Sequence, residues 1–424
     1  LAIFTPWLMK LITPGFSGEK LKELIFLSRL MFLSPVFLGI SSVLGGILQS
    51  FKRFLIFSLS PIFYNLGIIL GVVIFSKTLG ILGATIGVIA GAFLHMLILL
   101  PGVRQCGFRY RLVFDFTHQG VKRIVRLMVP RVLTLAVSQL NFLALTVIAS
   151  TLLAGSLAVF NLAYNIWSFP LGIFATSLAV AAFPSLSEWA QSKNGAKFKE
   201  VFSSSFRQII FLIIPSSAFF IVLRAQIVRV VLGGGKFGWE DTVLTINTLF
   251  FLVLGLFAEA LILLLVRSFF AIEDTMTPFY LGLVSSLFRI FAAWFFSRLM
   301  GVEGLALGFS IGGDIYFVLL WFVLRRKVKM LADREIFVSG VKILTASLFS
   351  SAAAYSVLLI FSFLVNTRTG LGIFIQGLAA GLIGLVFYVI LGLVLGLPET
   401  KIFWSGVKSR LPWRKVAPKE ITFE

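Results

Sequence analysis

Long apolar segments separated by short polar ones run through almost the whole chain. Four stretches contain no Asp, Glu, Lys or Arg: 54–76, 132–187, 343–367 and 369–398. A helix needs about 20 apolar residues to cross the hydrocarbon core of a bilayer. The second stretch is therefore long enough for two spans, and each of the others for one. The whole pattern predicts spans near residues 24–48, 54–76, 79–103, 128–151, 157–183, 206–223, 243–270, 278–298, 302–324, 343–365 and 370–396.

The composition agrees with this pattern. The chain is 59% hydrophobic and 13% charged, with a mean hydropathy of +1.03, whereas a soluble domain is about half apolar and a quarter charged. We therefore predict an all-α fold, a polytopic membrane protein built from spanning helices.

The formal net charge of +20 raises the question of a nucleic-acid partner. Between the predicted spans, about two thirds of the 37 Lys and Arg residues fall in alternate loops, as the positive-inside rule requires of cytoplasmic loops. The charge therefore indicates topology, with the C-terminal tail in the cytoplasm. We predict anionic membrane lipids as its partners, and no nucleic acid.

The residues that commonly carry chemistry are scarce. A single cysteine, Cys106, excludes an internal disulfide, and neither His95 nor His118 has neighbours suited to bind a metal. A membrane enzyme acting on polyprenyl phosphates would need clustered acids, histidines or arginines in its loops. The acidic pair 273–274 alone is too small for that purpose. We predict no enzyme activity, no cofactor and no metal site.

Two segments share one glycine spacing. GILGATIGVIAG (80–91) and GVEGLALGFSIG (301–312) both carry glycine at the first, fourth, eighth and twelfth positions. Small residues at this spacing line one helix face and let another helix approach closely. Each segment follows a Ser-Phe pair, a short polar turn and a proline, Pro61 or Pro278, that opens the previous span. We interpret this as a parallel internal repeat of two like lobes, a design that suggests alternating access.

The repeat divides the chain into three parts. Residues 1–120 are the remainder of a first transmembrane lobe, 121–330 a second lobe, and 331–424 two additional spans with a basic cytoplasmic tail. The two glycine segments lie 221 residues apart, and the second lobe begins near residue 121. We therefore expect the first lobe to be incomplete here, lacking two spans and most of a third.

Five other stretches resemble one protein family. They are ITPGF (12–16), SPIFYNLGI (60–68), SFPLGIFATSLAVAAFPSLSEWA (168–190), GGGKFGWEDT (233–242) and VRSFFAIEDTMTP (266–278). They are similar to segments of the bacterial lipid II flippases of the MurJ type, in the multidrug/oligosaccharidyl-lipid/polysaccharide exporter superfamily. The stretch 266–278 is the most specific, because it matches the family pattern Arg-x-Phe-Tyr-x-x-x-Asp-x-x-Thr-Pro most closely.

The resemblance implies a fold and an activity. The fold is two six-helix lobes plus two helices in the bacterial cytoplasmic membrane, and the expected state is a monomer. The activity is translocation of lipid II, the undecaprenyl-pyrophosphate-linked peptidoglycan precursor, for cell wall biogenesis and cell shape. The family holds a cationic cavity for the head group, since arginine binds pyrophosphate through planar, bidentate hydrogen bonds. It also has a groove for the polyprenyl tail along its last two helices. The alternatives are a flippase for another lipid-linked oligosaccharide, a drug/cation antiporter of the same superfamily, or a non-transporting scaffold.

Four residues are candidates for the substrate cavity. Arg131 and Arg267 lie at predicted cytoplasmic ends of spans, where each either contacts the head group or only reaches for the interface. For Arg267, which lies near Glu273 and Asp274, the second alternative includes a local acid partner. Gln139 either lines the cavity or bonds across helices, as does Asn141. Asn165 stands where family members often carry an arginine, and it either faces the cavity or leaves the head-group site without that charge.

Three charged residues fall inside predicted spans. Arg289 lies 11 residues after Pro278 and Asp314 lies 11 after Glu303, so the hairpin places both at similar depth, and Glu259 is central in the preceding span. A charge at the bilayer centre costs about 3 kcal/mol or more. We therefore predict an Arg289–Asp314 pair near the midplane, with Glu259 as a further member. It is either a switch between inward-open and outward-open states or a static pair.

Some family members bind a sodium ion with acidic and amide groups in the seventh and eleventh spans. The corresponding positions here are Leu145, Arg289 and Ala293. The resemblance therefore implies no sodium site, with the arginine standing in for the cation.

Overall fold

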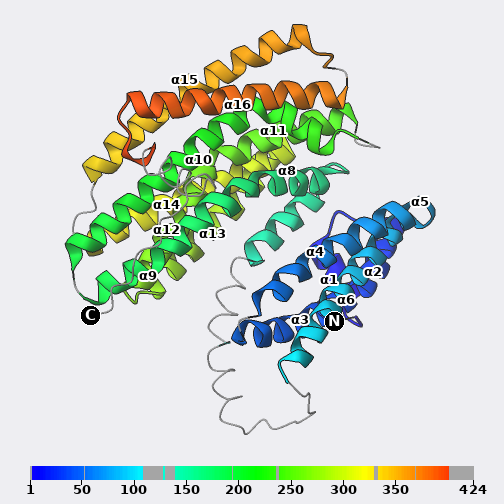
Figure 1. The fold of residues 1–424 in the computed structure, drawn as a ribbon. Coiled ribbons are helices and arrows are strands. Elements are labelled where there is room, and N and C mark those ends of the chain that lie inside the picture. The colour runs from blue at the N-terminus through cyan, green and yellow to red at the C-terminus, as the bar shows by residue number, and fades with distance from the viewer. Residues whose placement is uncertain are drawn as a thin grey trace. The chain divides into compact units, whose positions relative to one another are not determined.

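The computed structural model describes residues 2–51, 53–107, 128, 139–192, 194–234, 238–328, 333–367 and 369–400. Across these residues the regular structure is helical (Figure 1). The chain falls into two compact units, Leu1–Ala136 and Val137–Glu424.

The first unit is a bundle in which α6 packs against both α3 and α4. The span that begins as α4 changes to a π-helical segment, η1, and ends as α5. A π-helical segment is a local widening of an α-helix. The elements are α1 (Thr5–Ile12), α2 (Gly18–Met31), α3 (Leu33–Ser50), α4 (Phe54–Leu70), η1 (Gly71–Phe75), α5 (Ser76–Leu79) and α6 (Ile81–Gln105).

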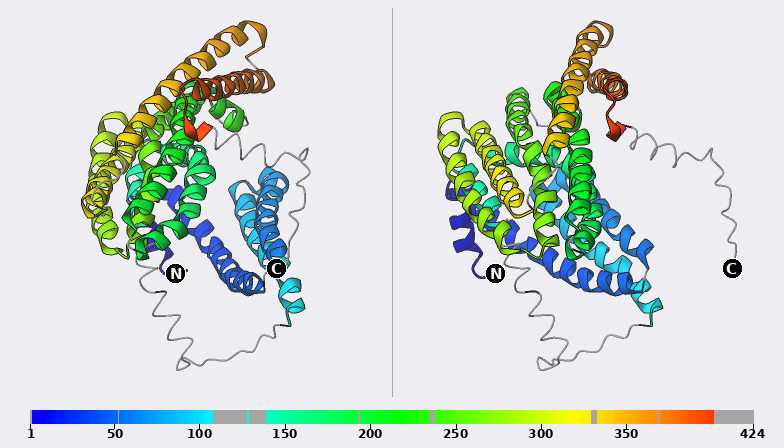
Figure 2. Two further views of the ribbon diagram at one scale, coloured as in Figure 1. Left: turned by 60° about the vertical axis from the view of Figure 1, so that its left-hand side comes forward. Right: turned by 90° about the vertical axis from the view of Figure 1, so that its left-hand side faces the viewer.

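The second unit contains the remaining helices. It opens with the helix Gln139–Ser150. The elements that follow are α8 (Ser156–Pro170), η2 (Leu171–Thr176), α9 (Ser177–Gln191), α10 (Gly195–Leu232), α11 (Trp239–Leu254), α12 (Leu256–Ala271), α13 (Met276–Met300), α14 (Val302–Val328), α15 (Asp333–Leu364) and α16 (Gly370–Val394). Helices α15 and α16 lie side by side and pack along α10 (Figure 2).

The predicted spans agree with the helices. The described residues contain nine helices long and apolar enough to cross a membrane, or ten if α11 and α12 count as one bent span. Each predicted span overlaps one of them, except 128–151, which lies partly outside the described residues. Two details differ. Helix α10 has 38 residues, about twice the length that a bilayer core requires, and the predicted span 243–270 is bent by 42° between α11 and α12. The predicted fold class is confirmed.

The glycine that opens each spaced-glycine helix has a special backbone conformation. Gly80 has φ of 57° and ψ of −133°, and Gly301 has φ of 63° and ψ of −135°. A side chain is strongly disfavoured at such positive φ. Glycine is therefore required at both positions, and the two turns have the same shape.

The next glycine of each helix makes the same contact in both units. A Cβ atom added at Gly83 would lie 2.5 Å from the carbonyl carbon of Phe75, and one added at Gly304 would lie 2.3 Å from that of Phe296. These pairs are separated by the same interval as the glycine segments. The helix-packing role predicted for the glycines is therefore confirmed. The predicted lobe boundary at residue 121 lies outside the described residues, and the three-part division of the chain stays a prediction.

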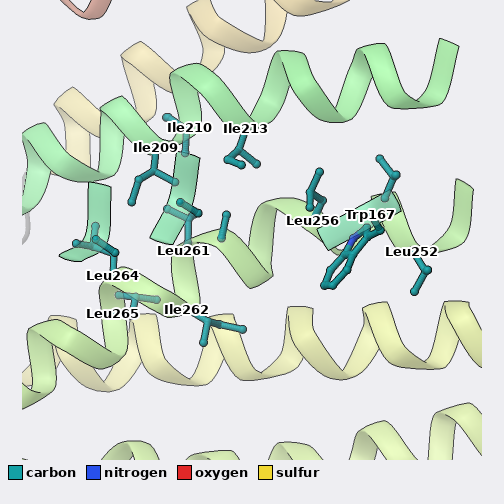
Figure 3. Close-up of a cluster of buried hydrophobic side chains, with 14 of the residues drawn as sticks. Trp167, Ile209, Ile210, Ile213, Leu252, Leu256, Leu261, Ile262, Leu264 and Leu265 are labelled. Atoms are coloured by element: carbon teal, nitrogen blue, oxygen red, sulfur yellow. The ribbon is translucent and has the colours of Figure 1, made fainter. Parts of the chain in front are cut away.

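The core of the second unit lies between α8, α10, α11 and α12 (Figure 3). Trp167, Ile209, Ile213, Leu252 and Leu261 are almost completely buried there. This apolar packing fixes the positions of the helices that carry the charged residues described next.

Polar bonds attach the last two helices to α10. Tyr388 of α16 donates a hydrogen bond to the carbonyl oxygen of Phe211 (2.7 Å). Arg207 of α10 pairs with Glu335 of α15 (3.3 Å) and with Glu399 after α16 (3.2 Å). Because these bonds link three helices, both polar bonds and apolar packing hold α15 and α16 to the second unit.

Candidate functional site

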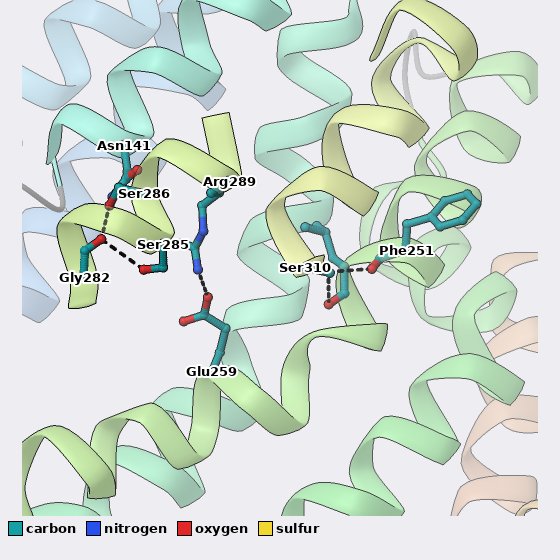
Figure 4. A network of polar contacts seen from close by, with 9 residues as sticks. Asn141, Phe251, Glu259, Gly282, Ser285, Ser286, Arg289 and Ser310 are labelled. Atoms are coloured by element: carbon teal, nitrogen blue, oxygen red, sulfur yellow. Dashed lines mark hydrogen bonds and ion pairs between the residues drawn. The ribbon is translucent and has the colours of Figure 1, made fainter. Parts of the chain in front are cut away.

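The bend between α11 and α12 sets the position of Glu259. Gly255 separates the two helices, and a Cβ atom there would lie 2.8 Å from the Cα atom of Ser310 on α14. The hydroxyl of Ser310 donates to the carbonyl oxygen of Phe251 (2.7 Å), in the last turn of α11 (Figure 4). Glu259 lies in the first turn of α12, where the positive end of the helix dipole favours a carboxylate.

Glu259 forms an ion pair with Arg289 of α13 (Figure 4). The side chains are only 14% exposed for Arg289 and 18% for Glu259. The predicted Arg289–Asp314 pair is therefore wrong in its partner, because the guanidinium binds Glu259. Asp314 makes no ion pair with a described residue, but it is close enough to both partners for its charge to interact with theirs.

Two adjacent glycines of α14 explain this choice of partner. A Cβ atom at Gly312 would lie 2.3 Å from the Cβ atom of Arg289. At Gly313 it would lie 2.7 Å from Glu259 Oε1 and 3.2 Å from Arg289 Nη2. The arginine side chain therefore crosses α14 over its glycine face and reaches α12. Asp314 is the next residue, and it points in a different direction because a helix turns by about 100° per residue.

An aromatic ring covers the guanidinium from another side. The centre of the Phe309 ring lies 4.4 Å from Arg289 Cζ, a distance at which a cation is attracted to the face of a ring. Phe309 also contacts the rings of Tyr164 and Trp167 on α8, with centroids 5.8 and 5.3 Å away. The cluster thus joins α8, α12, α13 and α14.

The cluster contains two carboxylates and one guanidinium. Removing one partner of a buried ion pair leaves an unpaired charge and costs about 3–5 kcal/mol. A second acid beside the pair, Asp314, offers the arginine another partner at similar depth. The arrangement places two acids within electrostatic reach of one guanidinium.

The predicted cavity residues that the structure describes are not part of this cluster. Arg131 lies outside the described residues. Gln139 and Asn165 are exposed, and neither side chain makes a hydrogen bond with a described residue. Arg267 donates to the carbonyl oxygen of Leu263 in its own helix (3.0 Å). Whether these residues contact substrate stays a prediction.

Asn141 and several unpredicted residues complete the surroundings. Asn141 donates to the hydroxyl of Ser286 on α13 (2.6 Å), which confirms bonding across helices. Tyr316 donates to the carbonyl oxygen of Pro278 (2.9 Å) and fastens α14 to the start of α13. Sequence reasoning missed Phe309 and Gly313. The sequence did contain a signal for Gly313. Two adjacent glycines stand at 312–313, whereas the repeat pattern requires a glycine only at the first of these positions.

The turn between α12 and α13 explains the motif 266–278. Asp274 accepts a hydrogen bond from the backbone N–H of Thr277 (3.0 Å), which caps the start of α13. Lys327, at the end of α14, binds the carboxylate of Asp274 and donates to the Thr277 hydroxyl (3.0 Å). The acid partner expected for Arg267 in this turn is therefore wrong: Lys327 engages Asp274, and Arg267 makes no ion pair with a described residue.

The charge of Asp274 is expected to stabilise the turn in a pH-dependent way. Burial alone would raise the pKa of Asp274, but hydrogen bonds from Lys327 and Thr277 outweigh it and hold the pKa below its ordinary value. A lowered pKa stabilises the folded state above the ordinary carboxyl pKa, and this stability is lost as the pH falls. Asp274→Asn keeps the cap but removes the charge. We expect it to cost about 1 kcal/mol or less at pH 7, since Lys327 is 43% exposed.

The measurement is the apparent unfolding temperature in detergent at pH 7 and below about pH 4. If the charge of Asp274 is responsible for the stabilisation, the difference in unfolding temperature between wild type and Asp274→Asn becomes smaller at the lower pH. A difference that stays constant across this range would contradict the assignment.

Glu273 in the same turn has a left-handed backbone, with φ of 62°. This conformation costs a residue with a side chain about 1–2 kcal/mol. We expect Glu273→Gly to raise the apparent unfolding temperature, by an amount equivalent to about 1 kcal/mol. Glu273→Ala is the matched control, because alanine removes the carboxylate and keeps the strain. Equal gains from both variants would show that charge, and not backbone conformation, is responsible.

Almost the whole chain matches a known protein family. The model of the lipid II flippase MurJ family matches residues 1–391. The chain belongs to the MurJ family. A solved structure of lipid II flippase MurJ in an inward closed conformation matches with a TM-score of 0.74 and 25% identity, over 96% of this chain and 80% of that one. This MurJ family member is a multi-pass membrane protein.

Curated relatives of the chain carry the same family name. A probable lipid II flippase MurJ from Borreliella burgdorferi is 31% identical over 73% of this chain and 62% of its own length. One from Thermotoga maritima is 31% identical over 78% of this chain and 66% of its own length. The chain thus spans less than two thirds of these two relatives. An inward-facing MATE multidrug transporter is similar in fold alone, with a TM-score of 0.66 and 17% identity over 78% of each chain.

Proposed function

We propose that this protein translocates the undecaprenyl-pyrophosphate-linked peptidoglycan precursor, lipid II, across the bacterial cytoplasmic membrane by alternating access. The observation that carries the proposal is the MurJ family match over residues 1–391. The relatives are named as lipid II flippases, and the family is one of transporters. A pyrophosphate cannot cross about 30 Å of hydrocarbon unaided, so the protein supplies a polar path.

We further propose that Arg289 changes its carboxylate partner during the transport cycle. In one state it pairs with Glu259, and in the other with Asp314. Each pairing neutralises one carboxylate, so both states avoid an isolated arginine at membrane depth. The support is the position of both acids within electrostatic reach of a single guanidinium.

The proposed topology follows the charge distribution. The basic loops and the C-terminal tail face the cytoplasm, which places the turn that contains Asp274 there and the turn at Gly301 on the outer side. Arg131 and Arg267 would then lie near the cytoplasmic entrance, where the head group arrives. Asn165 is exposed and stays a candidate for the cavity wall. Lipid II and membrane lipids are the proposed partners of a monomer.

The test is rescue of a bacterial strain depleted of its own lipid II flippase. The complete open reading frame that encodes this chain is expressed, and membrane insertion is verified. We expect restored growth and labelled lipid II on the outer face of the membrane. Failure of both readouts, with insertion confirmed, would overturn lipid II as the substrate. Growth without outer-face lipid II would overturn flipping itself.

A further inference from the structure

Helix α16 packs against α10 along one face. A Cβ atom added at Gly377, Gly381 or Gly384 would lie 3.1, 3.6 or 2.8 Å from a side chain of α10. The side chains met there are, in the same order, those of Gln226, Leu223 and Phe219. The glycines follow the spacing of three or four residues that defines one helix face, and small residues let membrane helices approach closely. The two antiparallel helices therefore share a tight contact surface.

Polar side chains join the helices at one end of this surface. Gln226 of α10 donates to Gln376 Oε1 of α16 (3.4 Å), and Gln376 donates to the carbonyl oxygen of Leu358 on α15 (2.8 Å). Gln376 is only 6% exposed. A buried amide in a membrane finds its hydrogen bonds on neighbouring helices. At this end, which is the outer one in the proposed topology, α10, α15 and α16 are therefore connected.

At the other end of the surface the chain folds back after α16. Gly396, with φ of 67°, turns the chain, and residues 397–400 return to the protein. Glu399 is 3% exposed and Thr400 is completely buried. A Cβ atom at Gly392 of α16 would lie 2.5 Å from Thr400 Oγ1, so this glycine provides space for the returning segment. We call residues 397–400 the latch.

A buried ion pair fixes the latch to α10. Glu399 Oε1 lies 3.2 Å from Arg207 Nε, and Nη1 of the same guanidinium lies 3.3 Å from Glu335 Oε2 on α15. The Glu399 side chain is 3% exposed, whereas that of Glu335 is 64% exposed. Water weakens the exposed pair, but removing one partner of a buried pair is costly. The pair with Glu399 therefore contributes more to the attachment.

We propose that the latch locks α15 and α16 onto α10, so that the three helices move as one rigid body during transport. The proposal rests on the proposed function in assuming a transport cycle. Polar bonds hold α16 at both ends, so it is fixed against sliding along α10. Lys342 of α15 donates to the carbonyl oxygen of Leu395 (2.9 Å), directly before the latch. Opening the latch would therefore loosen α15 as well.

The first experiment is hydrogen–deuterium exchange of the complete protein in liposomes. Glu399→Gln keeps the size of the side chain and removes its charge. Glu335→Gln is the matched control, because it removes an exposed acid from the same arginine. We expect Glu399→Gln to speed exchange in the last turn of α16 about tenfold, and Glu335→Gln about threefold or less. Exchange in α14 should not change.

Two outcomes of this experiment would overturn the latch. One is unchanged exchange in Glu399→Gln, and the other is an equal effect of both variants. Faster exchange in α14 as well would show general destabilisation, which also contradicts a local lock.

Gly392→Ala tests the latch without changing a charge. Its Cβ atom would take the space of Thr400 Oγ1, so we expect the same acceleration of exchange in the last turn of α16. Gly381→Ala on the same helix is the control, because its Cβ atom would meet Leu223 Cδ1 at an ordinary 3.6 Å. If Gly392→Ala exchanged no faster than Gly381→Ala, packing of the latch would not hold α16.

The second experiment asks whether α10 and α16 must separate during transport. Gln226→Cys is combined with Gly377→Cys, and Cys106 and any other cysteine of the complete protein are replaced by serine. The two Cβ atoms would lie 3.1 Å apart, close to the separation of about 3.5–4.5 Å in a disulfide. We expect equal outer-face lipid II in the oxidised and reduced forms. Activity of the reduced form alone would overturn the rigid body.

The exchange measurement separates this proposal from the proposed function, because it requires no transport. The expected exchange rates in a protein that fails to rescue the depleted strain in either redox form would support the latch and overturn the transport of lipid II. Rescue that the disulfide blocks would leave the transport of lipid II standing and overturn the rigid body alone.

Discussion

Replacing Arg289 with methionine is expected to abolish rescue of a flippase-depleted strain. Methionine preserves much of the side-chain volume, but it leaves Glu259 without its cation next to Asp314. Removing one partner of such a buried pair costs about 3–5 kcal/mol. The measurements are growth, outer-face lipid II and the apparent unfolding temperature in detergent. Arg326→Met is the matched control, because Arg326 is an exposed arginine near the end of α14.

A double variant separates a switch from a static pair. Glu259→Leu with Arg289→Met removes both charges, and apolar replacement of a buried ion pair is often neutral or stabilising. We expect the double variant to recover the unfolding temperature and to remain inactive, because no arginine is left to exchange partners. Recovery of both stability and rescue would show that the pair only neutralises two charges.

Gly308→Ala is expected to have the largest effect on folding. A Cβ atom there would lie 2.2 Å from the backbone nitrogen and 2.3 Å from the Cα atom of Ala293 on α13. Backbone atoms cannot rotate away as a flexible side chain can, so the two helices must separate. Overpacking of this kind costs about 3 kcal/mol. The measurements are the yield of folded protein and its apparent unfolding temperature.

The control is Gly340→Ala on α15. A Cβ atom there would meet only Ile210, with its Cδ1 atom at 3.9 Å, an ordinary van der Waals distance. Replacing glycine with alanine inside a helix should stabilise by up to about 1 kcal/mol. If both variants behaved alike, the close approach of α13 and α14 would not be what the glycine spacing provides.

The sequence predicted the spans and the glycine contacts because both depend on local pattern. Length and apolarity are sufficient to place a membrane helix, and the spacing of the glycines defines one helix face. The contacts of Gly83 and Gly304 show that this information was enough to identify which surfaces approach closely.

The partner of Arg289 could not be predicted in the same way. Counting residues gives the depth of a side chain in the membrane, but not its direction around the helix. That direction depends on the 42° bend beside Gly255 and on the space above Gly313, which both arise from tertiary packing. The acid partner expected for Arg267 failed for a similar reason, since Lys327 comes from a distant part of the sequence.

The close contact between α13 and α14 determines which part of the charged cluster can move. The two helices meet backbone to backbone at Gly304, Gly308 and Gly312. We therefore expect the hairpin to move as one rigid body that carries Arg289. Helix α12 joins its neighbour α11 only through the bend beside Gly255. We therefore expect a change in the separation of the ion pair to come from α12 pivoting at that joint. Glu259 is then the partner that moves, and Arg289 stays in place on the hairpin.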